Sequence, residues 1–176
     1  VFACAINAKL LPLIFIPYIF VQLSWKQFAL FTGVTAFVVV LQFFPFVNLD
    51  TIENFGASIE LYFQKFEFNA SVYYLLREVG YLMVDYNAIE HIGKILPAAT
   101  ILLIVTISLR AKRTDLFDFT TVLKILAIYF SLALVVHPWY LSSLILVACF
   151  NRYISPLLWS FLVFLSYSRS VSYTHL

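Results

Sequence analysis

Six polar and aromatic residues in an otherwise apolar chain have the chemistry to hold a ligand or to order a site. They are Lys9, Asn69, Arg77, His137, Trp139 and Tyr140. A lysine ammonium, an arginine guanidinium and a histidine near neutral pH can each bind the oxygens of a phosphate. Tryptophan and tyrosine rings are flat surfaces for a sugar ring or an isoprenoid. These six residues are therefore the candidate binding groups.

Lys9 lies in the apolar run Asn7-Ala8-Lys9-Leu10-Leu11-Pro12. A lysine within a membrane segment costs about 3 kcal/mol on insertion scales, so a functional partner is expected by default. The residue pattern is equally compatible with a side chain that reaches the membrane interface. Pro12 and Pro17 are expected to kink or interrupt this helix, as happens where a membrane helix lines a cavity.

Asn69 and Arg77 belong to a predicted amphipathic helix outside the membrane. Asn69 is expected to be its N-cap, with the side-chain oxygen accepting a hydrogen bond from a free backbone N–H. Arg77 and Glu78 follow on this helix, either as a solvated face or as part of a polar lid in which Arg77 binds an anionic group. Asn69-Ala70-Ser71 also matches the N-glycosylation pattern.

His137-Pro138-Trp139-Tyr140 is the densest polar and aromatic cluster in the membrane part of the chain. One reading is a binding site in which the histidine contacts phosphate or carries a proton. The other is an interfacial aromatic belt with a turn proline. The spacing of the residues does not separate the two readings.

The composition indicates a membrane protein. The 176 residues are 63% hydrophobic, 19% aromatic and 11% charged, with a mean hydropathy of +0.96. An ordinary soluble domain has roughly 25% charged residues and cannot bury this much apolar surface in one core. The composition excludes a soluble domain, a disordered chain and a nucleic-acid binder with a basic face.

Cofactor and metal motifs are absent from the sequence. There is no GxGxxG, P-loop, HExxH or paired CxxC motif, so we expect neither a cofactor nor a metal. Cys4 and Cys149 lie far apart in apolar runs. We expect them to pack as small apolar residues and not to form a disulfide.

Uncharged stretches predict an all-α, polytopic membrane protein, because a spanning helix needs about 20 mostly apolar residues. About six membrane segments are expected on this basis. Their predicted ranges are 2–22, 28–46, 94–110, 117–136, 139–152 and 154–168. The last two are short and are compatible with a re-entrant pair buried among other helices.

The region 47–93 differs from the rest, with seven acidic residues against two basic ones. Apolar residues at helical spacing predict two amphipathic helices here, which lie along the membrane surface or cap a cavity. The basic residues Lys26, Arg110, Lys112, Arg113 and Arg152 lie in other connections. Because cytoplasmic loops are rich in lysine and arginine, we assign those connections to the cytoplasm, and 47–93 and 137–140 to the external side.

Four motifs together resemble bacterial integral-membrane glycosyltransferases of the GT-C superfamily, nearest to mannosyltransferase-like proteins of Bacteroidetes. They are Asn7-Ala8-Lys9-Leu10-Leu11-Pro12; Phe66-Glu67-Phe68-Asn69-Ala70-Ser71-Val72-Tyr73-Tyr74; His137-Pro138-Trp139-Tyr140-Leu141; and Leu158-Trp159-Ser160 with Leu165-Ser166-Tyr167. The Lys-x-x-Pro element is distantly similar to that of GPI mannosyltransferase I. The resemblance covers nearly all of residues 1–168, and 169–176 resemble a non-native tail.

The resemblance implies a bacterial inner-membrane, multi-pass enzyme with 47–93 and 137–140 facing the periplasm. Such enzymes move a sugar, typically mannose, from a polyprenyl-phosphate donor to a lipid or glycan acceptor on the external face. The family's catalytic acid lies in an early external loop with no counterpart here, so the chain is expected to be a C-terminal part and the general base to lie upstream.

The resemblance also suggests a role for each candidate residue. The phosphate partners would be Lys9, Arg77 and His137. The sugar or prenyl chain would contact Trp139 and Tyr140, and Asn69 would order the external helix.

Two other functions compete with this one. A lipid-linked glycan transporter or polymerase component would be equally apolar and aromatic, although a proton-coupled transporter usually carries an acid within its membrane segments. A non-enzymatic membrane scaffold is the third reading. It predicts that Lys9, Asn69 and His137 are scattered and do not line a common cavity.

Overall fold

The chain is all-helical in a computed structural model that describes residues 1–64, 67–84, 89–113 and 118–173. The α-helices are α1 Phe2–Ala8, α2 Ile16–Gln22, α3 Trp25–Phe43, α4 Leu49–Gln64, α5 Ser71–Val84, α6 Ile89–Arg110, α7 Phe119–Leu132, α8 Ser142–Ala148 and α9 Ser155–Tyr173. Three 3₁₀ turns are η1 Leu11–Phe15, η2 Phe44–Phe46 and η3 Pro138–Leu141. Within the described residues, extended pairing is limited to an isolated bridge between Phe68 and Val135. The all-α prediction is confirmed.

Two helices have the length and hydropathy to cross a membrane, Trp25–Phe46 and His91–Arg110. They contain the predicted segments 28–46 and 94–110. The other four predicted segments form shorter or broken helices in the described part of the chain. Six membrane segments therefore remain a prediction. The last helix, α9, extends to Tyr173 and so includes residues 169–173 of the predicted tail.

Prolines divide the N-terminal segment into three pieces, as predicted. The first helix ends at Ala8, and Lys9 has an extended backbone with φ −162° and ψ 132°. Pro12 lies at the start of η1 and Pro17 at the start of α2. Proline is favoured at a first helical position because it has no N–H to leave unpaired there. The segment therefore folds back on itself, and Lys9 lies at a bend.

The predicted interruption at His137 is also present. The α7 helix ends at Leu132, and the chain then runs extended to His137, which precedes η3. In this extended stretch Leu134 accepts a hydrogen bond from the Phe68 N–H (2.9 Å), and the Val136 N–H donates to the Phe68 carbonyl (2.8 Å). These two bonds join the region before α5 to the segment that carries His137.

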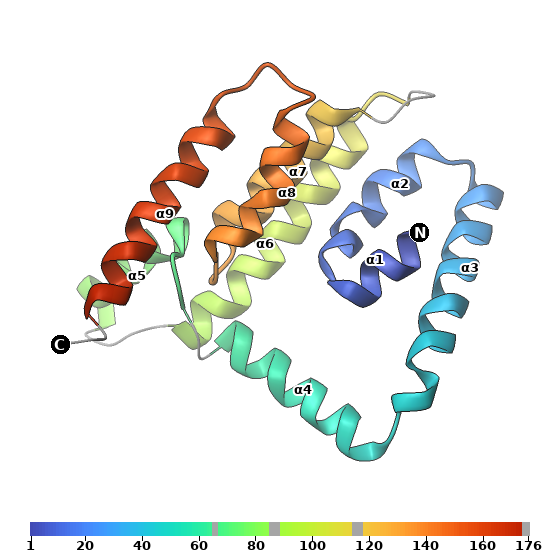
Figure 1. Cartoon of the computed structure of the whole chain (residues 1–176), viewed down its shortest axis with the longest axis horizontal. Coiled ribbons are helices and arrows are strands. Elements are labelled where there is room, and N and C mark those ends of the chain that lie inside the picture. Colours follow the sequence, from blue (N-terminus) through green and yellow to red (C-terminus); the bar gives the residue numbers. More distant parts are fainter. Residues whose placement is uncertain (65–66, 85–88, 114–117, 174–176) are drawn as a thin grey trace.

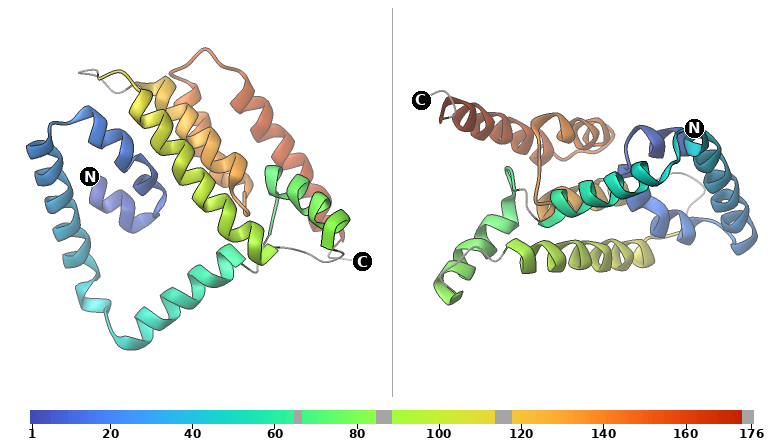
Figure 2. Two further views of the ribbon diagram at one scale, coloured as in Figure 1. Left: turned by 180° about the vertical axis from the view of Figure 1, so that it is seen from behind. Right: turned by 90° about the horizontal axis from the view of Figure 1, so that it is seen from below.

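Two apolar clusters hold the molecule together. The larger one lies between α2, α6, α7, α8 and α9 and includes the fully buried Tyr18, Ile125 and Leu144. Helices α6, α7 and α8 pack in sequence, with α1–α3 to one side and α9 to the other (Figure 2). The smaller cluster joins the start of α5 to α6 and to the stretch after α7. Its buried members are Ala70, Tyr73, Ile92, Leu96, Leu134 and Val135.

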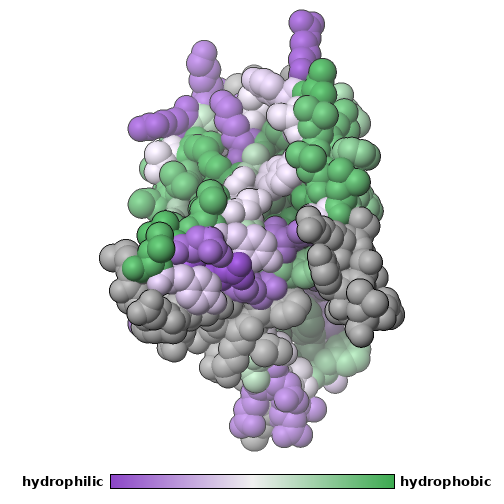
Figure 3. Space-filling view, turned by 90° about the vertical axis from the view of Figure 1, so that its left-hand side faces the viewer, coloured by the Kyte–Doolittle hydropathy of each residue, from purple (hydrophilic) through white to green (hydrophobic). Residues whose placement is uncertain are grey.

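Apolar side chains also cover much of the outer surface. No residue of α3 is buried, although this helix is one of the two with membrane-spanning length. The space-filling view shows an apolar belt with hydrophilic side chains above it and below it (Figure 3). An exposed apolar surface of this extent is typical of a membrane-facing or protein-facing surface.

The predicted amphipathic region forms α4 and α5. On α5 the apolar stripe of Leu75, Leu76 and Val79 is exposed, and Tyr73 on another face is buried. The helix is therefore attached through its first turn, with its apolar stripe directed outward. In the first predicted amphipathic stretch the apolar residues at helical spacing are Ile59, Tyr62, Phe63 and Phe66, and their side chains lie outside the described ones.

The three connections that carry basic residues lie along one end of the molecule, as Figure 1 shows for the α2–α3 junction, the end of α6 and the α8–α9 connection. The Gln22 side chain donates to the Lys112 carbonyl (3.0 Å), and Asn151 donates to the Phe119 carbonyl (3.2 Å). The turn η3 and the helix α5 lie at the opposite end. The common end agrees with the prediction that these connections share one side of the membrane. The assignment of that side to the cytoplasm remains a prediction.

Candidate functional site

Lys9 and Tyr140 meet although they are far apart in the sequence. The Lys9 ammonium lies over the Tyr140 ring, 3.8 Å from its centroid. A cation over an aromatic face gains about 0.5–1 kcal/mol at an exposed site. The bend at Lys9 and the short turn η3 bring the two side chains together. Lys9 is exposed, so its ammonium remains accessible to a ligand.

Aromatic rings surround His137. Trp139 stacks on the imidazole with a centroid distance of 4.5 Å and an interplanar angle of 4°. Tyr140 meets the imidazole edge-on at 5.1 Å, and Phe68 lies 4.9 Å away. The imidazole Nδ1 is buried and has no hydrogen-bond partner. We name Lys9, Phe68, His137, Trp139 and Tyr140 the cation–aromatic cluster.

The environment of His137 favours its neutral form. Burial lowers the pKa of His137 below its ordinary value of 6.5, and the positive charge of Lys9 lowers this pKa further. At neutral pH the imidazole is therefore uncharged, and Lys9 is the cation of the cluster. A phosphate at this position would reverse the effect on the His137 pKa, because a nearby anion stabilises the imidazolium.

We predict that NMR titration of the imidazole will give a pKa for His137 below 6.5, and that Lys9→Met will raise this pKa. Because the unfolded chain binds the proton more tightly than the folded one, the His137 contribution to stability falls as pH drops from above 6.5 through the folded pKa. The Lys124→Met variant is the matched control and should leave the His137 pKa unchanged. An unchanged pKa of His137 in Lys9→Met would contradict the electrostatic effect of Lys9 on the imidazole.

A second group of polar contacts lies beside the cation–aromatic cluster, on residues that flank Phe68. Arg77 donates from Nη1 to Glu67 (2.5 Å) and from Nη2 to Glu78 (3.1 Å). The Arg77 guanidinium also lies over the Tyr74 ring, 4.8 Å from the centroid. With both terminal nitrogens on carboxylates, Arg77 is better placed to position the segment before α5 than to receive a phosphate.

The prediction that Asn69 is the N-cap of α5 is wrong. The helix starts at Ser71, and its first turn closes from the Tyr74 N–H to the Ala70 carbonyl (3.2 Å). Asn69 lies one residue earlier, with a left-handed φ of 54° that asparagine tolerates better than most residues. Its side-chain oxygen accepts a hydrogen bond from the Ser166 hydroxyl (2.7 Å). Asn69 therefore connects this segment to α9.

The same geometry bears on the glycosylation pattern at Asn69. The side-chain nitrogen, to which a glycan would be attached, is buried in the folded chain. The Asn69 N–H donates to the Tyr74 hydroxyl (3.1 Å), which holds the residue in place. The pattern is therefore inaccessible in this fold.

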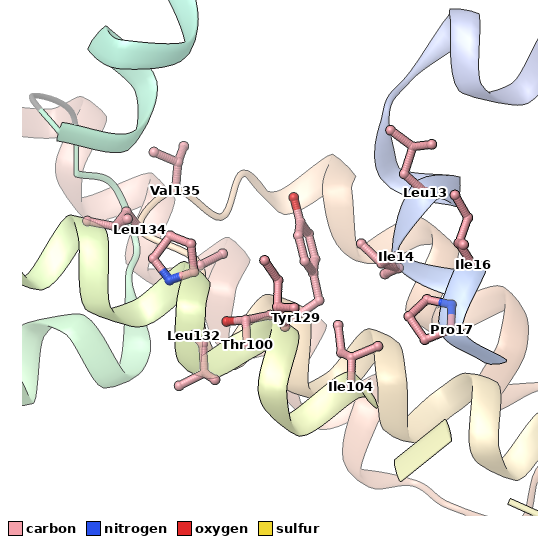
Figure 4. Close-up of a pocket in the computed structure, with 13 residues that line it drawn as sticks. Leu13, Ile14, Ile16, Pro17, Thr100, Ile104, Tyr129, Leu132, Leu134 and Val135 are labelled. Atoms are coloured by element: carbon pink, nitrogen blue, oxygen red, sulfur yellow. The ribbon is translucent and has the colours of Figure 1, made fainter. Parts of the chain in front are cut away.

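An apolar cavity of about 410 Å³ lies between η1, α2, α6 and the end of α7. Figure 4 shows Tyr129 between Leu13 and Ile14 on one side and Leu134 and Val135 on the other. The Thr100 hydroxyl in the lining is already bonded to the Leu96 carbonyl (2.8 Å). The volume lies in the range of small-ligand sites, and the lining suits an apolar chain.

The cavity and the cation–aromatic cluster are connected through the backbone. Leu13 of the cavity follows Lys9 by four residues, and Val135 precedes His137 by two residues. The structure thus brings four predicted residues, Lys9, His137, Trp139 and Tyr140, into one cluster, and chain segments that adjoin Lys9 and His137 in the sequence line the cavity. Asn69 and Arg77 are joined to this cluster through Phe68 and Tyr74.

Sequence reasoning missed several contact residues, namely Glu67, Phe68, Tyr74 and Ser166. All four lie within the motifs that carry the family resemblance, but no pattern in the sequence assigns them a partner. Among the described residues, no group of three His, Cys, Asp or Glu side chains could hold a metal ion. Cys4 and Cys149 are free and exposed.

No family model, curated protein or solved structure matches the chain.

Proposed function

We propose that this chain is part of a bacterial inner-membrane glycosyltransferase. In this proposal it moves a sugar, typically mannose, from a polyprenyl-phosphate donor to a lipid or glycan acceptor on the external face. The observation that carries the proposal is the juxtaposition of an accessible ammonium, a stacked aromatic group and an apolar cavity. These three features match the phosphate, the sugar and the prenyl chain of such a donor.

Each part of the donor has a proposed partner. The phosphate would lie at Lys9, with His137 beside it as a neutral hydrogen-bonding group that gains a proton as negative charge builds up. Trp139 is 56% exposed and would contact the sugar with the part of its surface that faces outward. The first units of the prenyl chain would enter the apolar cavity between η1, α2, α6 and α7.

The two remaining candidate residues, Arg77 and Asn69, are proposed as positioning residues. Arg77 and Asn69 would fix the segment 67–70 against Tyr74 and α9 and so keep Phe68 against His137. Four of the six residues, Lys9, His137, Trp139 and Tyr140, converge in one cluster, which favours a binding site over a scaffold. None of the six lines the apolar cavity itself.

In the proposed reaction the acceptor hydroxyl loses its proton to a general base, which we expect outside this chain. The acceptor oxygen bonds to the anomeric carbon while the bond from that carbon to the phosphate oxygen breaks. The electron pair of the broken bond leaves with the polyprenyl phosphate. Lys9 would neutralise the charge that develops there, which is an electrostatic contribution made where the charge appears.

The test is transfer of labelled mannose from polyprenyl-phosphate mannose by the full-length protein in nanodiscs. We expect transfer from this donor and none from a nucleotide sugar. Trp139→Ala should weaken binding of the sugar-bearing lipid more than binding of undecaprenyl phosphate, because only the former carries the group that contacts the indole. Transfer from a nucleotide sugar, with none from polyprenyl-phosphate mannose, would contradict the proposed polyprenyl-phosphate donor. Lipid binding without any transfer would favour the transporter reading.

A further inference from the structure

The end of the molecule opposite the cation–aromatic cluster carries basic residues on a well-defined backbone. Gln22, at the end of α2, donates from its side chain to the Lys112 carbonyl (3.0 Å) and accepts from Arg113 Nε at its own carbonyl (3.4 Å). Lys26 lies in the first turn of α3, only four residues after Gln22. The side chains of Lys26, Lys112 and Arg113 are all exposed around this point.

The start of α3 is fixed by local hydrogen bonds. The Ser24 N–H donates to the Gln27 side chain (3.0 Å), and the Ser24 hydroxyl donates to the same oxygen (2.8 Å). The first of these bonds is one half of a capping box, in which the Ser24 side chain also accepts from the Gln27 backbone N–H, and the box sets where the helix begins. Lys26 is therefore held at a defined position beside the end of α2.

The charge at this end is strongly positive. The connections here carry Lys26, Arg110, Lys112, Arg113 and Arg152, against Asp115 and Asp118. Asp118 is occupied by its own helix, because its carboxylate accepts from the Thr120 N–H (3.0 Å) and the Thr121 hydroxyl (2.5 Å). Asp115 lies outside the described residues. The basic side chains thus outnumber the acidic ones.

The depth of this end in a membrane follows from the two helices of spanning length. The helix α3 starts here with Trp25 and Lys26, and α6 ends here with Arg110. Trp25 is 72% exposed, and Tyr153 next to Arg152 is 54% exposed. Tryptophan and tyrosine collect at the level of the lipid headgroups, where lysine and arginine meet anionic lipid.

We propose that this end is a docking surface for the headgroups of anionic phospholipids, centred on Lys26, Lys112 and Arg113 around the end of α2. The occupant is lipid because aromatic residues at headgroup depth flank the basic side chains, and because the positive charge complements a phosphodiester. The surface is distinct from the Lys9 site, and it does not depend on the proposed transferase activity.

The test compares lipid binding by detergent-solubilised protein in native mass spectrometry, with phosphatidylglycerol and phosphatidylcholine as probes. We expect a preference for phosphatidylglycerol that falls about fivefold for each of the variants Lys26→Gln, Lys112→Gln and Arg113→Gln. Arg113→Lys should retain the preference. Lys94→Gln is the matched control, because it removes one positive charge near the other end of α6.

Three outcomes would overturn the proposal. The first is a lipid preference that is unchanged in the Lys112→Gln and Arg113→Gln variants. The second is an equal loss in Lys94→Gln, which would indicate a response to net charge alone. The third is displacement of phosphatidylglycerol by millimolar inorganic phosphate, which would indicate a site for free phosphate. Thermal melting of each variant without lipid checks that the fold is intact.

Discussion

Replacing Lys9 with methionine is expected to weaken the binding of undecaprenyl phosphate by roughly 10- to 100-fold, because a hydrogen bond to a charged group contributes about 1.5–3 kcal/mol. Methionine is an unbranched side chain of similar reach, so the packing over the Tyr140 ring is largely kept while the charge is lost. Lys9→Arg should retain most of the affinity. The measurement is a binding titration with the protein in nanodiscs.

The matched control for Lys9 is Lys124→Met, which removes an exposed lysine from α7 without touching the cation–aromatic cluster. This control should bind undecaprenyl phosphate as the parent protein does. Undecaprenol, which lacks the phosphate, should bind the Lys9→Met variant and the parent equally. If Lys9→Met left the affinity for undecaprenyl phosphate unchanged, Lys9 would not be a phosphate partner. The proposed placement of the donor phosphate at Lys9 would then be wrong.

The local features of the fold were predictable because single residues impose them. Pro12 and Pro17 start new helical pieces, since proline has no N–H for the preceding turn. Pro138 likewise lies at the start of a new piece, η3, although α7 has already ended at Leu132. The long apolar runs 28–46 and 94–110 needed only length and hydropathy to be recognised as helices.

The contacts between distant residues were not predictable from the sequence. The Lys9 ammonium meets Tyr140 only because two bends coincide in space, and the Phe68–Val135 bridge depends on how α5 packs against α6. The role of Asn69 was mistaken for the same reason. A local rule assigns its side chain to the nearest helix start, but Ser166 of α9 competes for the same oxygen.

Replacing Tyr73 with alanine is expected to destabilise the attachment of α5 by about 3–5 kcal/mol, the cost of emptying a fully buried aromatic site. Tyr73 is 0% exposed and belongs to the small cluster with Ile92, Leu96 and Leu134. The rest of the outward stripe of α5 cannot compensate, because it makes little contact with the body. Hydrogen exchange of the α5 amides should accelerate strongly, and the melting temperature should fall.

The matched control is Leu82→Ala on the same helix, where the side chain is 87% exposed and its removal should change exchange and melting very little. The pair of variants also separates the two halves of the site. Undecaprenyl phosphate binding should persist in Tyr73→Ala, because the contact of Lys9 with Tyr140 does not pass through α5, while the bond between Asn69 and Ser166 loses its support. Equal destabilisation by Leu82→Ala would mean that the exposed stripe, and not Tyr73, attaches α5 to its surroundings.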